Sequence, residues 1–111
     1  MTAIAFVGTY TDADETGVFS YRVADDTLAR IDGVSAGRDP SYLRLGPDAK
    51  RLYVVEEADA GRIRAFAVDG EGGFDPLNDR PTGDAGPCHC SVAAAGDYVF
   101  VAHYAGGSVG M

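Results

Sequence analysis

Five polar side chains in this chain have the chemistry to act on a small anionic substrate. His89 and Glu57 carry an imidazole and a carboxylate, which can take up and release protons near neutral pH. Arg44 carries a permanent positive charge that can hold an anionic group. Tyr42 and Ser91 stand two residues from Arg44 and His89, a spacing that places each pair on one face of a strand. His89 and Glu57 are therefore candidate functional residues. The predicted substrate-binding residues are Arg44, Tyr42 and Ser91.

The same side chains have a second interpretation, in which they only hold the fold together. A polar group that is removed from water needs a hydrogen-bond partner. A neighbouring part of the protein can supply that partner as well as a substrate can. The sequence leaves both interpretations open for each of these residues.

Cys88, His89 and Cys90 form a short run that could suggest a metal site. On a strand both sulfurs would point to one face and the imidazole to the other, whereas structural zinc sites use wider ligand pairs and four ligands. We therefore predict no metal site, and we interpret both cysteines as small core residues. Their spacing is too short for an unstrained disulfide, which favours a reducing, cytoplasmic location.

Residues 106–110 match the Gly-x-Ser-x-Gly pattern of serine hydrolases, with Ser108 in the place of the nucleophile. That nucleophile requires a strand, a turn and a helix, with an acid and a histidine further along the chain. Only Met111 follows this segment. The glycines fit a turn between two strands better, so Ser108 is not among the predicted catalytic residues.

The segments that must position these residues are predicted to be short β-strands. Runs rich in Val, Phe and Tyr lie between clusters of Gly, Pro and Asp, and helical periodicity is nearly absent. The predicted fold class is therefore all-β. Nine strands are expected, at residues 4–9, 17–23, 28–34, 41–45, 52–57, 63–68, 88–93, 98–103 and 108–111.

The strands repeat along the chain with an offset of 47 residues. This offset aligns three segments that each begin with an aromatic residue and Val: Phe6–Tyr10, Tyr53–Glu57 (with Val54) and Phe100–Tyr104. It also aligns His89 with Tyr42. A period in the forties that is built from four short strands is typical of a β-propeller blade.

The repeat indicates a partial propeller of about two to two-and-a-half blades of four-stranded antiparallel sheet. Residues 40–86 hold a complete blade, residues 1–39 lack a first strand, and residues 87–111 stop in the third strand. A propeller needs about four to eight blades to close. We therefore predict an N-terminal fragment whose remaining blades are absent from this chain. A self-contained β-sandwich is the alternative.

The composition argues against several classes of partner. The chain has 111 residues, 9 basic and 17 acidic, and a formal net charge of −8. This charge argues against nucleic acid and against an anionic membrane surface as partners. No signal peptide or membrane span is expected, because no apolar run approaches ~18 residues. The excess of Asp over Glu and of Arg over Lys indicates either adaptation to high salt or a GC-rich genome.

Six segments together are similar to a known family. They are Phe6–Thr11, Gly17–Tyr21, Pro40–Leu43, Leu52–Glu57, Gly86–His89 and Val99–Val109. In these segments the chain resembles the N-terminal third of the lactonase family of seven-bladed propellers. That family includes propeller-type 6-phosphogluconolactonases and fungal 3-carboxymuconate lactonising enzymes.

The resemblance implies that the intact protein hydrolyses a small anionic sugar lactone, most simply 6-phosphoglucono-1,5-lactone, without a cofactor. It matches His89 to the histidine of the family's Pro-Cys-His segment and Glu57 to the glutamate after its strand, and on that match His89 and Glu57 are the predicted catalytic residues. His103 stands where the family more usually has Asn. The resemblance also places most of the family's catalytic residues in later blades, so this chain alone is not expected to turn over substrate.

Three alternatives to the lactone hydrolase remain open from the sequence. A lactonising isomerase of the 3-carboxymuconate type would have the same repeats. A non-catalytic propeller would bind proteins or small ligands on its face. An inactive product of a broken gene would have the same residues without a function of its own.

Overall fold

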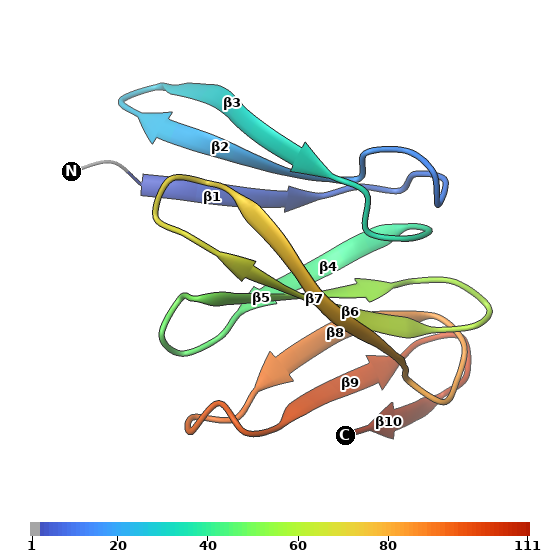
Figure 1. The fold of residues 1–111 in the computed structure, drawn as a ribbon. Coiled ribbons are helices and arrows are strands. Elements are labelled where there is room, and N and C mark those ends of the chain that lie inside the picture. Colours follow the sequence, from blue (N-terminus) through green and yellow to red (C-terminus); the bar gives the residue numbers. More distant parts are fainter. Residues whose placement is uncertain (1–2) are drawn as a thin grey trace.

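The computed structural model describes residues 3–111, in which all regular structure is β-strand (Figure 1). Met1 and Thr2, which belong to the first predicted blade, lie outside the described residues. In residues 3–111 there is no helix able to cross a membrane. The strands are β1 (Ala3–Gly8), β2 (Val18–Ala24), β3 (Thr27–Val34), β4 (Pro40–Leu45), β5 (Arg51–Glu56), β6 (Arg62–Val68), β7 (Phe74–Pro81), β8 (Pro87–Val92), β9 (Val99–His103) and β10 (Ser108–Gly110).

Three antiparallel sheets follow one another along the chain. Their strand orders are β1-β2-β3, β4-β5-β6-β7 and β8-β9-β10, so each sheet is a simple meander. In Figure 1 they are coloured blue to cyan, green to yellow and orange to red. The prediction of an all-β chain of antiparallel sheets is confirmed, and the three sheets have three, four and three strands in chain order.

β7 is the strand that the sequence analysis did not include among its nine expected strands. Its residues Phe74–Pro81 contain two prolines and little of the Val and Tyr that mark the other strands. β7 forms an edge of its sheet, and an edge strand tolerates proline because its outer N–H groups need no partner in the sheet. Pro76 also lies at a register shift opposite Phe66.

The repeat is visible in the backbone hydrogen bonds of the loops. The N–H of Asp39 donates to the carbonyl of Thr11 at 2.8 Å, and the N–H of Gly86 donates to that of Ala58 at 2.9 Å. Asp39 and Gly86 are 47 positions apart, and both have a positive φ, of 48° and 64°. The same turn thus precedes β4 and β8, and in one of them Asp accepts a conformation that favours Gly.

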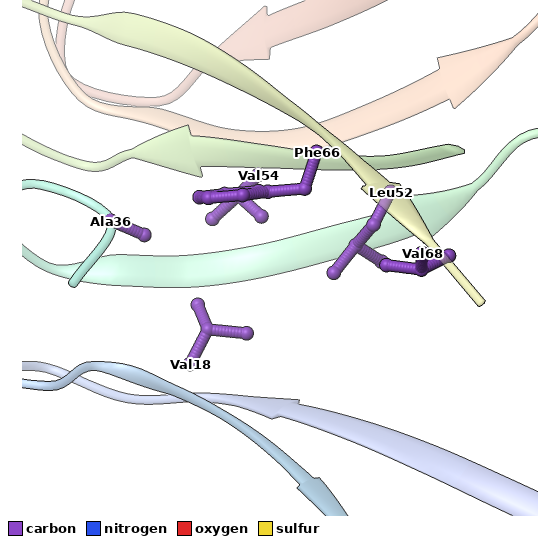
Figure 2. Packing of buried hydrophobic residues seen from close by; sticks show 6 residues of the cluster. All are labelled: Val18, Ala36, Leu52, Val54, Phe66 and Val68. Carbon is purple, nitrogen blue, oxygen red and sulfur yellow. The ribbon is translucent and has the colours of Figure 1, made fainter. Parts of the chain in front are cut away.

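The first junction, between the β1–β3 sheet and the β4–β7 sheet, holds the larger apolar core (Figure 2). Its buried residues are Val18, Ala36, Leu52, Val54, Phe66 and Val68. Phe74 packs edge-on against Phe6 and Phe66, with ring centroids 5.6 and 6.0 Å away. Side chains alternate along β5, so Leu52 and Val54 face this junction.

The second junction, between the β4–β7 sheet and the β8–β10 sheet, holds a smaller core. Its buried residues are Val55, Cys90 and Val101. Tyr42, Tyr53, Ile63 and Val99 pack against them and are partly buried. Because β5 is flanked by sheets on both faces, its two sets of alternate residues are both apolar, as expected for a central strand.

One end of the molecule gathers the connections on which the candidate site depends. The loops β1–β2, β3–β4, β5–β6, β7–β8 and β9–β10 all lie at the right-hand end in Figure 1. The loops β2–β3, β4–β5, β6–β7 and β8–β9 lie at the other end. We call the first of these the loop end. Glu57 follows β5 there, and Ser41 lies at the start of β4.

Candidate active site

Tyr42 and His89 are brought together by the contact between β4 and β8, the strands that end two neighbouring sheets. Their ring centroids are 4.6 Å apart, and the ring planes are inclined by 38°. His89 is exposed and Tyr42 is half-buried. Within the described residues the ring nitrogens of His89 have no hydrogen-bond partner, so the contact with Tyr42 is the interaction that orients the imidazole.

Arg44 and Ser91 lie further along the same two strands. Arg44 is exposed, and its Nε donates to the carbonyl of Cys90 at 3.5 Å, which is a weak hydrogen bond. Ser91 shares the outer face of β8 with His89, as the alternation of side chains predicts. The two line an open apolar face together with Phe100 and Ala102. The equivalent residues of the preceding sheet, Tyr53 and Val55, pack against the sheet that follows, so this is the face on which a further sheet would pack.

Glu57 lies at the loop end and is held by hydroxyls from two other elements. Its Oε1 accepts hydrogen bonds from Tyr10 at 2.9 Å and from Ser41 at 2.6 Å. The carboxylate raises the pKa of the Tyr10 phenol, chiefly because the phenol donates that hydrogen bond. The side-chain hydrogen bonds of Glu57 in the described part of the chain involve Oε1, so Oε2 can still accept one.

The predicted residues therefore form two groups. Tyr42 and His89 are in direct contact, with Arg44 and Ser91 on the same strands. Glu57 belongs to a separate cluster with Tyr10 and Ser41, and no hydrogen bond joins it to His89 within residues 3–111. Sequence reasoning did not include Tyr10 or Ser41. The signal that could have found Tyr10 is the repeat, which aligns it with Glu57 in the next blade.

Glu56, which is adjacent to Glu57 in sequence, has a different set of partners. It is buried, with 7% of its surface exposed, and its Oε2 lies 3.2 Å from Nη2 of Arg64. Its Oε1 accepts the backbone N–H of Arg38 at 3.0 Å. Asp79 completes the network by pairing with Arg62 and Arg64 at 2.6 and 2.8 Å. These partners give Glu56 a structural role between two sheets.

Ser108 is tied into a structural chain of hydrogen bonds. Its hydroxyl donates to Oδ2 of Asp84 at 2.6 Å and lies 3.3 Å from Nδ1 of His103. Because the one hydroxyl proton goes to Asp84, Nδ1 of His103 must be the donor to Ser108. Ser108 follows a turn and begins strand β10, so the interpretation of its glycines as a hairpin turn is confirmed.

The cysteines fit the predicted role in part. Cys90 is fully buried in the second junction, and burial raises the pKa of its thiol to about 11. Cys88 is only half-buried, and its Sγ contacts the carbonyl of Ala102 at 3.7 Å. The prediction that it is a core residue is wrong, because the register of β8 and β9 shifts between Pro87 and His89 and breaks the alternation. In the described chain no three His, Cys, Asp or Glu side chains are grouped to hold a metal.

Comparison with known proteins identifies relatives of the whole described chain. The family model described as "Lactonase, 7-bladed beta-propeller" matches residues 4–111. The 6-phosphogluconolactonase of Bacillus subtilis (strain 168) is 30% identical over 110 residues, which are 96% of this chain and 32% of that protein.

Two solved structures have the same arrangement of strands. One, from Bacteroides fragilis and provisionally assigned as a 6-phosphogluconolactonase, superposes with a TM-score of 0.88 at 29% identity, over 97% of this chain and 31% of that one. The periplasmic gluconolactonase PpgL of Pseudomonas aeruginosa gives 0.79 at 27% identity, over 93% and 31%. The chain thus spans about a third of the length of these relatives.

Proposed function

Since this chain belongs to the family of seven-bladed β-propeller lactonases, we propose that the propeller it contributes to hydrolyses a sugar lactone. The substrate proposed is 6-phosphoglucono-1,5-lactone and the product 6-phosphogluconate. The observation that carries the proposal is the family match over residues 4–111, supported by a 6-phosphogluconolactonase relative at 30% identity. The reaction needs water and acid–base groups, so the proposal includes no cofactor.

His89 is the proposed acid–base group for the attacking water. Water adds to the lactone carbonyl carbon as the imidazole takes one of its protons. The tetrahedral oxyanion then collapses, the bond from that carbon to the ring oxygen breaks, and the ring oxygen takes up a proton. The contact with Tyr42, at 4.6 Å between ring centroids, supports this role because it orients the imidazole.

Arg44 and Ser91 are the proposed partners for the anionic and polar parts of the substrate. The guanidinium of Arg44 is exposed and has only one weak hydrogen bond in the described residues, so its charge is available to a phosphate or an oxyanion. Ser91 lies on the same face of β8 as His89, two residues along the strand. Glu57, whose Oε2 remains free to accept a hydrogen bond, is the second proposed acid–base group.

The remaining blades are part of this proposal. The chain covers 32% of the Bacillus subtilis relative, so further groups of a complete site would come from sequence beyond the matched third. We propose that residues 3–111 contribute one side of the site and need the other blades for turnover. A cytoplasmic location is also proposed, supported by the free thiols of Cys88 and Cys90. Because one relative is periplasmic, the location is tested by cell fractionation, which should recover the protein in the cytoplasmic fraction.

The catalytic assignment is tested by measuring steady-state lactone hydrolysis by a complete propeller that carries this chain. A pH-stat records the acid that the reaction releases. We expect His89→Asn to lower kcat by about 100-fold or more, the usual contribution of an acid–base group. Glu57→Gln should lower kcat as well. Ser108→Ala is the matched control and should keep kcat within about twofold, because its hydroxyl is committed to Asp84.

Three outcomes would overturn the proposal. Unchanged kcat in His89→Asn would remove the imidazole from the mechanism. If no sugar lactone gives acid release but a carboxymuconate is cyclised, the lactonising isomerase is favoured. If ligands bind and no reaction occurs, the non-catalytic propeller is favoured.

A further inference from the structure

Three residues form a row at the loop end, one from each sheet. Tyr10, Glu57 and Tyr104 come shortly after β1, β5 and β9, and successive members are 47 positions apart. The hydrogen bond from Tyr10 to Glu57 shows that equivalent positions in neighbouring sheets lie side by side. The row therefore runs from sheet to sheet across the loop end of the molecule.

The backbone places Tyr104 in the same position relative to its own sheet as Glu57. The N–H of Glu57 donates to the carbonyl of Asp39 at 3.0 Å, and the N–H of Tyr104 donates to that of Gly86 at 2.9 Å. The two acceptors are themselves equivalent in the repeat and share a positive φ. Tyr104 consequently stands beside Glu57 on the side opposite Tyr10.

Within residues 3–111 the aromatic rings of this row belong to neither apolar core. The residues just before Glu57 and Tyr104 are Glu56 and His103, which point between the sheets and are only 7% and 4% exposed. In contrast, Tyr10 is 70% exposed and Tyr104 is 86% exposed. Large rings left in water contribute nothing to the core, whereas exposed aromatic residues around a polar group are typical of binding sites.

Tyr10 is nevertheless fixed in place. Its hydroxyl donates to Oε1 of Glu57 at 2.9 Å, and Ser41 holds the same oxygen at 2.6 Å. This anchoring restricts the rotation of an otherwise exposed side chain, so less entropy is lost when a ligand binds against the ring. It also directs further hydrogen bonding to Oε2 of Glu57.

We infer that Tyr10 and Tyr104 are sugar-binding residues that flank Glu57 and hold the substrate's carbon–hydrogen face against their rings. The C–H groups of a sugar carry partial positive charge and suit the negative face of an aromatic ring. A hydroxyl at the edge of the same sugar donates to the free oxygen of Glu57. This inference rests on the proposed function, and it names the residues that contact the sugar carbons.

The kinetic test compares Tyr10→Ala, Tyr10→Phe and Tyr98→Ala in a complete propeller that carries this chain. Tyr98 precedes β9 at the opposite end of the strand from Tyr104 and is 51% exposed, so it is a matched exposed tyrosine. Tyr10→Ala should raise KM about 10-fold with little change in kcat, because a ground-state contact is lost. Tyr10→Phe keeps the ring and should raise KM only about twofold to threefold. Equal KM values in Tyr10→Ala and Tyr98→Ala would overturn the inference.

A binding test separates this inference from the proposed reaction. Ring-labelled tyrosine signals are followed by NMR while 6-phosphogluconate is added, and Tyr→Phe variants assign the signals. We expect the Tyr10 and Tyr104 signals to shift and the Tyr98 signal to stay. Signal shifts without any lactone hydrolysis would overturn the proposed reaction but support the sugar site. Hydrolysis without a shift at Tyr10 would support the reaction and overturn the sugar site.

Discussion

The two junctions between sheets are built on the same repeat but are packed differently. The first junction buries six apolar residues, whereas the second buries three. Part of this difference is one of coverage, because Phe66 and Val68 of the first core belong to β6, and the equivalent positions of the third sheet, after β10, lie beyond residue 111. Positions 47 apart show a second contribution, from side-chain size. Leu43 packs against the first core, and its equivalent in the second core is the smaller Cys90. Leu52 is buried in the first core, and its equivalent in the second is the smaller Val99.

This difference indicates that one junction contributes mainly to stability and the other mainly to the candidate site. Smaller side chains bury less apolar surface, and each CH₂ removed from a core is worth about 0.8 kcal/mol. The second junction is also where the predicted site residues Tyr42 and Arg44 lie, facing β8. Within residues 3–111 we therefore expect the first junction to supply most of the packing energy and the second to hold the polar groups that a substrate would contact.

The sharpest test of this comparison is truncation of one core residue in each junction. Leu52→Ala should lower the free energy of unfolding by about 2–5 kcal/mol, because a fully buried side chain leaves a cavity. Val101→Ala, which is 6% exposed in the second junction, should cost about half as much. Urea denaturation of the purified protein measures both. Leu45→Ala is the exposed control, and a larger loss for Val101→Ala than for Leu52→Ala would refute the comparison.

Alkaline pH should weaken the second junction through Cys90. Burial raises the pKa of its thiol from 9.0 to about 11, so the unfolded chain loses this proton first. Stability from this group is complete below pH 9 and falls as the pH rises from 9 to about 11, by up to about 2–3 kcal/mol. Denaturation curves at stepped pH measure this slope. Cys90→Ala should flatten it and Cys88→Ala should not; an unchanged slope in Cys90→Ala would assign the effect to another group.

Glu56 and Glu57 are adjacent in sequence and provide a contrast between the two kinds of role. Glu56→Gln removes the charge that faces Arg64 at 3.2 Å, and we expect a loss of about 1–2 kcal/mol, since the arginine is partly exposed. Glu57→Gln keeps a hydrogen-bond acceptor for Tyr10 and should change the unfolding free energy by less than about 0.5 kcal/mol. Thermal unfolding compares the two, and equal losses would make Glu57 structural as well.

Much of this architecture was predictable because its signals are local and repeated. The alternation of apolar residues and the turn glycines placed nine strands to within one residue at each end. The exception, β7, carries prolines at an edge position where the alternation rule has little force. The incomplete burial of Cys88 has a similar cause, because a register shift in β8 interrupts the period of two.

The candidate site was predictable only in part. The alternation along β8 put His89 and Ser91 on one face, and the repeat aligned them with Tyr42 and Arg44. The partners of Glu57 depend on how far one sheet is rotated from the next, which no local pattern encodes. Tyr10 reaches the carboxylate across such a step, whereas Ser41 reaches it from the neighbouring strand β4 of the same sheet.

The smallest expected effects concern the polar contacts that cross each junction. In the first, the buried hydroxyl of Ser20 donates to the carbonyl of Gly72 at 2.6 Å, and Ser20→Ala should cost about 1 kcal/mol. In the second, Arg44 reaches Cys90 at 3.5 Å while remaining exposed, so Arg44→Met should cost less than about 0.5 kcal/mol. Urea denaturation resolves this ordering. A cost for Arg44→Met as large as that for Ser20→Ala would mean that the guanidinium stabilises the fold, and its charge would then be less available to a substrate.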